Sequence, residues 1–174
     1  MSCSLCDGKC CRELLITATV FDVIRISEKI GKKVEEFAEL VEPRVLRVDW
    51  KNVVECKEGL YVLALKSRPC IFLDGNRCSI YDVAPLSCKA YPSSLGSLSI
   101  EQCPTASRVI FKIHNPGKKN LEKLEREVRE HKKIVAKVSS KERVKKEVLE
   151  KMIEEGRKSL KSSRASAHFS GGSS

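Results

Sequence analysis

The stretch that decides the fold reads Cys3-Ser-Leu-Cys6-Asp-Gly-Lys-Cys10-Cys11, and it holds four of the chain's nine cysteines. The two-residue gap between Cys3 and Cys6 lets both sulfur atoms turn toward one metal ion, and this spacing is typical of a ligand pair. Neighbouring side chains diverge in extended backbone, so Cys10 and Cys11 would either serve two metals or bracket one cluster. The stretch therefore predicts a metal-binding domain with thiolate ligands.

A second cysteine group begins at Cys70. Cys70 and Cys78 flank Asp74-Gly75-Asn76, which is a turn signal between two short runs of strand-forming residues. We therefore expect an antiparallel hairpin over 71–81. Its pairing would bring both thiols to the same side, where they would complete a site with the first group.

The remaining cysteines differ in their surroundings. Cys88 lies in a segment, 84–105, that three prolines are expected to keep largely irregular, and Cys103 directly precedes Pro104. Cys56 lies on a predicted strand, where a small buried apolar role is favoured over a metal ligand. The eight clustered cysteines are the candidate metal ligands: Cys3, Cys6, Cys10, Cys11, Cys70, Cys78, Cys88 and Cys103.

Eight thiols match two four-ligand sites, which would be two zinc ions, two iron–sulfur clusters or one of each. They also permit one site with additional redox-active thiols. Met1 and Ser2 leave no room for a secretory signal before Cys3, so we expect a cytoplasmic protein with reduced thiols. Abundant Lys, Arg and Glu with a single Gln resemble a thermophile's composition, which keeps structural disulfides as an alternative. The close cysteine spacing favours metal.

Four basic residues each lie next to a cysteine in the sequence: Lys9, Arg12, Arg77 and Lys89. A site of four thiolates around a divalent metal has a net negative charge, which these side chains would offset. They are equally consistent with solvated surface charges.

Local patterns also predict regular elements before residue 91. Thr19 and Asp22 have the spacing of a capping box, and Gly31 suits a helix end, so we expect a helix from Val20 to about Ile30. A second short helix is expected over 33–41. Strands are expected over 44–49, 53–57 and 60–66.

The chain changes character after Gly117. It has a net charge of +10, of which residues 118–174 contribute +8. Apolar residues and His131 recur there at three- and four-residue steps, which predicts a helix over 121–138, and Ser139 with Glu142 predicts the start of another. The sequence thus indicates an α+β fold: a small metal-stabilised cysteine-cluster domain at 1–117, a charged helical hairpin at 118–161, and a disordered Ser/Gly tail at 162–174.

The first region resembles the YkgJ-like cysteine-cluster family, a zinc- or iron-chelating domain often labelled an iron–sulfur oxidoreductase. The resemblance covers about residues 3–105. It is carried by the first cysteine group, Thr19, Asp22–Ile26, Gly31, Pro69–Leu73, Cys78–Tyr81, Pro85, Cys88 and Tyr91-Pro92. It implies that the eight candidate ligands are the family's cysteines. Where the family often has arginine beside the Pro-x-x-Cys segment, this chain has Ala84 and Lys89.

Three functions follow as hypotheses. The first is an iron–sulfur or zinc protein whose centre is redox-active. The second is a structural zinc module whose basic region contacts nucleic acid or a protein partner. We favour a solvated helical face over nucleic-acid binding, because aromatic residues are not interleaved with the charges. The third, implied only by the relation of flagellin lysine methylases to this family, is a protein-modifying enzyme.

Some classes are excluded, and other properties stay open. The longest apolar run, Leu60–Leu65, is far too short to cross a membrane. No G-x-G-x-x-G or P-loop sequence occurs, so nucleotide chemistry has no support. The helices at 118–161 would pair within one chain or between two chains, and the sequence does not decide between enzyme and binding module.

Overall fold

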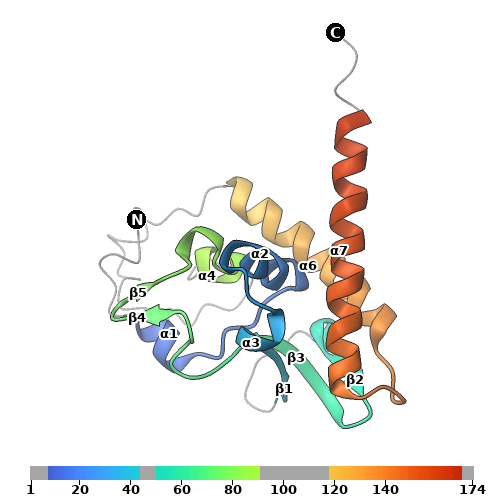
Figure 1. The fold of residues 1–174 in the computed structure, drawn as a ribbon, viewed down its shortest axis with the longest axis horizontal. Coiled ribbons are helices and arrows are strands. Elements are labelled where there is room, and N and C mark those ends of the chain that lie inside the picture. The colour runs from blue at the N-terminus through green and yellow to red at the C-terminus, as the bar shows by residue number, and fades with distance from the viewer. Residues whose placement is uncertain (1–7, 44–49, 91–117, 170–174) are drawn as a thin grey trace. The chain divides into compact units, whose positions relative to one another are not determined.

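The computed structural model of the chain describes residues 8–43, 50–90 and 118–169 (Figure 1). It mixes helices with short antiparallel strands, so the predicted α+β class is confirmed. The helices are α1 (Lys9–Glu13), α2 (Val20–Ile30), α3 (Val34–Phe37), α4 (Leu86–Ala90), α6 (Lys118–Val138) and α7 (Lys145–Phe169), with 3₁₀ turns η2 (Trp50–Asn52) and η3 (Tyr81–Val83).

The strands form two small sheets. They are β1 (Ala38–Val41), β2 (Val54–Cys56), β3 (Gly59–Leu65), β4 (Leu73–Asp74) and β5 (Arg77–Cys78). The first sheet has the order β1-β3-β2, and the second is the hairpin β4-β5. The chain forms two compact units, the first from residues 1–39 and 63–128 and the second from residues 40–62 and 129–174.

Helix α2 begins and ends where the sequence predicts. The Thr19 backbone N–H donates to Asp22 Oδ2 (2.9 Å), and the Asp22 N–H donates to Thr19 Oγ1 (3.2 Å), which completes the capping box. The helix ends at Gly31, whose φ of 68° is the left-handed conformation that glycine adopts without strain. Its apolar face provides much of the first unit's core: Val20, Phe21, Val23, Ile24 and Ile26 are all buried.

The helix predicted over 33–41 is wrong in its second half. Only Val34–Phe37 is helical, and the chain continues as the strand β1. Burial along Ala38–Val41 alternates between buried and half-buried residues, which is the two-residue period of a strand. Pairing with β3 thus overrides the local helical preference.

Both predicted strands around the turn at 57–59 are confirmed. β2 pairs with β3 in an antiparallel register that matches Val54 with Tyr61 and Cys56 with Gly59. The strand predicted over 44–49 lies outside the described residues. Farther along β3, residues 61–65 are all buried, and Thr17 forms an isolated bridge with Ala64.

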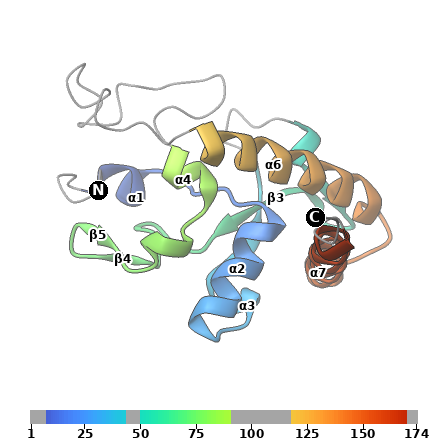
Figure 2. The same cartoon turned by 90° about the horizontal axis from the view of Figure 1, so that it is seen from above.

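The hairpin predicted over 71–81 is present but short. β4 pairs with β5 through Leu73 with Cys78 and Asp74 with Arg77, leaving Gly75 and Asn76 as the turn. The chain then bends into η3 instead of continuing as a strand. The hairpin lies beside α1 in both views (Figures 1 and 2).

The predicted C-terminal helices are confirmed, but the predicted start of α7 is wrong. Ser139 does not cap α7, which begins at Lys145. Its hydroxyl instead accepts from the Glu55 backbone N–H (3.2 Å) and donates to the Val135 carbonyl oxygen (2.9 Å). The serine therefore joins the end of α6 to β2 within the second unit.

Helix α7 runs to Phe169, so it includes part of the segment predicted to be a disordered tail. No proline or glycine interrupts residues 157–170, which explains why the helix continues there. Among the described helices, none has the length and apolar composition needed to cross a membrane.

Candidate metal centre

Five of the eight candidate ligands line one cavity of the first unit, with a volume of about 170 Å³. They come from α1, from the hairpin region and from α4, which are far apart in the sequence. The five are Cys10, Cys11, Cys70, Cys78 and Cys88. The rest of the lining is mainly apolar and includes Leu14, Ile16, Phe72 and Ile80. Cys3, Cys6 and Cys103 lie outside the described residues, so their metal-binding role stays a prediction.

Helix α1 positions Cys10 and Cys11, and a glycine precedes it. Gly8 has a φ of 73°, and a Cβ atom there would lie 3.1 Å from Leu73 Cδ1. A larger residue would therefore be strained and would also push against the hairpin. The Sγ atoms of Cys10 and Cys11 are 3.9 Å apart. Two sulfur ligands of a tetrahedral zinc ion, each about 2.3 Å from the metal, lie about 3.8 Å apart, so this pair fits one ion.

Three hydrogen bonds join α1 to the hairpin and to the segment before it. The Cys70 backbone N–H donates to the Cys11 carbonyl oxygen at 2.7 Å. The Arg12 guanidinium donates to the Gly75 carbonyl oxygen (2.7 Å) and to Asn76 Oδ1 (2.8 Å). Arg12 thus holds the two cysteine-bearing segments together, a role that its place beside Cys11 in the sequence did not reveal.

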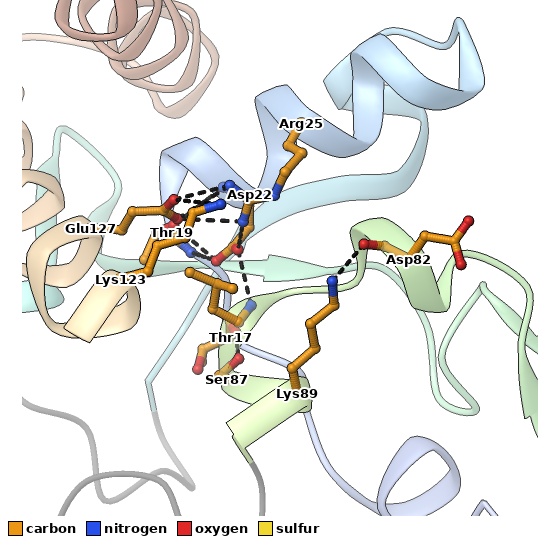
Figure 3. A network of polar contacts seen from close by, with 10 residues as sticks. Thr17, Thr19, Asp22, Arg25, Asp82, Ser87, Lys89, Lys123 and Glu127 are labelled. Atoms are coloured by element: carbon orange, nitrogen blue, oxygen red, sulfur yellow. Dashed lines mark hydrogen bonds and ion pairs between the residues drawn. The ribbon is translucent and has the colours of Figure 1, made fainter. Parts of the chain in front are cut away.

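Cys88 is carried by the five-residue helix α4. The Leu86 backbone N–H donates to Asp22 Oδ1 (3.0 Å), and Ser87 Oγ donates to the Thr17 carbonyl oxygen (3.3 Å) (Figure 3). The Lys89 ammonium donates to the Asp82 carbonyl oxygen, as Figure 3 also shows. Tertiary contacts, rather than the length of the helix, therefore fix the position of this thiol.

The cavity disfavours several thiolates at once. Burial raises the pKa of Cys70 and Cys78, and it raises that of Cys88 well above the ordinary range. The hydrogen bond with Cys10, followed by burial, raises the pKa of Cys11. A bound cation would supply the missing positive charge and displace the thiol protons.

These residues fit a thiolate-bound metal by their chemistry. Thiolates are the ligands that zinc and iron–sulfur clusters take in proteins. Within residues 8–43, 50–90 and 118–169, however, no group of three His, Cys, Asp or Glu side chains has the arrangement needed to hold a metal ion. The thiols therefore line one cavity, but their sulfur atoms do not converge on a common metal position.

Two residues outside the cavity behave as the sequence predicts. Cys56 lies on β2 with 2% of its surface exposed, and it does not line the cavity. Burial raises its pKa to about 11, which suits an inert small apolar residue. His131 is also buried, at 3% exposure, in the apolar face of α6.

Sequence reasoning missed a buried ionic network behind α4. Capping is the only structural role that the sequence pattern predicts for Asp22, yet its carboxylate also accepts hydrogen bonds from the Leu86 N–H and from the Arg25 guanidinium. Arg25 in turn donates to Glu127 (3.0 Å) on α6. The only local signal was Asp22 with Arg25, one helical turn later, and no pattern linked either residue to Glu127.

A family model described as "putative zinc- or iron-chelating domain" matches residues 2–126. The matched range includes the whole first cysteine group, the hairpin and α4, and it ends within α6. No curated protein and no solved structure gives a significant match to the chain.

Proposed function

The chain belongs to this family of zinc- or iron-chelating domains, and we propose that it binds an iron–sulfur cluster and serves in electron transfer. Cys10, Cys11, Cys70, Cys78 and Cys88 would be ligands. The proposal extends to Cys3, Cys6 and Cys103, which the sequence groups with them. Such a cluster supplies one-electron chemistry when it is bound.

The observation that carries this proposal is the number of thiols around one cavity. Five cysteines line it, whereas a tetrahedral zinc ion takes four ligands. The volume of about 170 Å³ also exceeds what a single ion needs, since about 10–15 Å³ on the same measure is enough for one water molecule. Both features favour a polynuclear centre over a single ion.

The remaining lining residues support a redox role. Leu14, Phe72 and Ile80 give the cavity apolar walls. Such walls limit the approach of water, and solvent exposure is one of the properties that set the reduction potential of an iron–sulfur centre. The protein would hold the ligands in place and control the polarity around them.

A structural zinc site is the second candidate, and one distance favours it. The 3.9 Å separation of the Cys10 and Cys11 sulfur atoms matches two ligands on one tetrahedral ion. In that case the metal would stabilise the fold, and the chain would act as a binding module for nucleic acid or a protein partner.

Metal analysis of anaerobically purified protein tests the proposal. We expect iron and acid-labile sulfide in the wild-type chain, with brown colour and visible absorption. Cys70→Ser and Cys88→Ser should each lose most of the iron. Cys56→Ala is the matched control, because it removes a buried cysteine that does not line the cavity, and it should keep the wild-type iron content.

Three results would contradict the assignment. Colourless protein with tightly bound zinc would replace it with the second candidate. Equal iron loss in Cys56→Ala and Cys88→Ser would show that general destabilisation, rather than ligand removal, explains the loss. Thiols joined as disulfides, with neither metal present, would exclude both candidates.

A further inference from the structure

The carboxylate of Asp22 is almost completely buried, at 1% exposure, although it does not line the cysteine cavity. Its Oδ2 atom accepts from the Thr19 backbone N–H (2.9 Å) and from the Thr19 hydroxyl (2.8 Å). Its Oδ1 atom accepts from the Leu86 backbone N–H (3.0 Å) and from Arg25. Capping α2 explains only the bonds to Thr19. The bonds on Oδ1 need another explanation.

The bond to Leu86 joins residues 64 positions apart and reaches the first residue of α4. The first N–H groups of a helix have no partner within it, so this carboxylate satisfies one of them. Leu86 and Ala90 pack against Leu124 of α6. Helix α4 is thus held by an apolar contact with α6 and by the polar contact with Asp22. Cys88 lies between Leu86 and Ala90.

Arg25 offsets the free-energy cost of burying the Asp22 carboxylate, and Glu127 in turn pairs with Arg25. An unpaired buried charge is strongly destabilising, whereas a paired and hydrogen-bonded one is accepted. Arg25 donates to Asp22 Oδ1 and also to Glu127 Oε1 at 3.0 Å (Figure 3). The network joins α2, α4 and α6 of the first unit, and its polar contact on α4 is two residues from Cys88.

We infer that Asp22 is a positioning residue of the metal centre: it fixes the first turn of α4 so that the Cys88 thiol stays at the cavity. The inference rests on the proposed function for its metal readout, but not for the position of the thiol. Asparagine at this site offers one acceptor oxygen in place of two. In Asp22→Asn, either the Thr19 donors or the Leu86 and Arg25 donors would therefore face an NH₂ group.

The first test does not need metal. Reduced, metal-free protein is treated with iodoacetamide under native conditions, and alkylation at each cysteine is followed by peptide mass spectrometry. In Asp22→Asn, alkylation of Cys88 should become several-fold faster relative to Cys78 in the same molecule. Thr19→Ala is the matched control, because it weakens the α2 cap while leaving the Leu86 contact in place. It should leave that ratio unchanged.

The second test measures iron retention by anaerobically reconstituted protein during titration with a chelator. Loss of a residue that orients a ligand commonly weakens metal binding about 10–100-fold, and we expect that range for Asp22→Asn. In a Cys88→Ser background the same substitution should cause little further loss. A merely structural role would instead give additive losses, as expected for Thr19→Ala.

The outcomes separate the two claims. If wild-type protein binds neither iron nor zinc, the proposed function fails, and the alkylation ratio alone decides the role of Asp22. An unchanged Cys88-to-Cys78 ratio in Asp22→Asn would overturn the inference whether or not metal binds. Additive losses of iron in the double variant would also overturn it.

Discussion

The cysteine-bearing part of the first unit and the helical part of the second unit differ in the length of their regular elements and in how these are stabilised. Around the cavity, α1 and α4 have five residues each, and β4 and β5 have two. In the second unit, α7 alone has 25 residues, and its buried face includes Val148, Met152 and Ile153. Helices of one or two turns are not stable by themselves, whereas long amphipathic helices are stabilised by apolar packing. We therefore expect bound metal to stabilise the cysteine-bearing region, where the regular elements are too short to do so alone.

Removal of the metal is the most direct test of the difference between the two regions. With excess chelator under reducing conditions, we expect amides in α1 and the β4–β5 hairpin to lose hydrogen-exchange protection, whereas α4 should keep part of its protection because Asp22 and α6 still hold it. Amides at 129–163 should keep theirs. Structural metal contributes on the order of 10 kcal/mol in small zinc domains, so this is the largest effect we expect.

The control for metal removal is re-addition of the metal. Protection should return in the cysteine region when iron and sulfide, or zinc, are added back. If protection is lost equally in both units, the second unit depends on the metal as well, and the contrast between them is wrong.

The features that could be predicted from the sequence depend on local contacts, and those that could not depend on distant ones. Three features were predicted correctly: the α2 capping box, the turn at Gly75 and the apolar face of α6. Each depends on residues within a few positions of one another. The contacts that shape the site are distant. Arg12 reaches a turn 63 residues away, and Arg25 reaches Glu127 across 102 residues. A local pattern cannot encode such contacts.

Two of the wrong predictions have a related cause. The segment after Phe37 has an acceptable helical pattern, but β3 offers it a strand partner. Ser139 and Glu142 have capping-box spacing, but the Ser139 hydroxyl is used by Glu55 and Val135. In both places a tertiary partner competes with the local motif and wins. The five cysteines that line the cavity could be predicted to lie together because close cysteine spacing is a local signal.

The second unit should show a pH dependence that comes from His131. Burial, with Lys132 as a smaller cause, lowers its pKa to about 4 from an ordinary value of 6.5. Between pH 4 and pH 6.5, His131 is largely protonated in the unfolded chain but largely neutral in the folded chain. The free energy of unfolding should therefore be largest above pH 6.5 and fall toward pH 4, by up to about 1.4 kcal/mol per pH unit.

Urea unfolding of wild type and His131→Leu between pH 7 and pH 5 measures this contribution. The leucine variant should lack the His131 share of the slope, while the carboxylates common to both proteins cancel in the comparison. Identical slopes would mean that His131 is accessible to protons in the folded chain, and the second unit would then be less well packed than its burial indicates.

The smallest expected effect tests how closely α1 must approach the hairpin. Gly8 and Gly31 both have left-handed backbone, with φ of 73° and 68°. Alanine should cost about 1 kcal/mol at either position from backbone strain alone. At Gly8 the new Cβ would also lie 3.1 Å from Leu73, whereas nothing lies within 4 Å at Gly31.

We therefore expect Gly8→Ala to be the more destabilising change and to lower iron retention, and Gly31→Ala to leave iron retention unchanged. Equal effects on iron retention would show that contact between α1 and the hairpin does not set the spacing of the thiols.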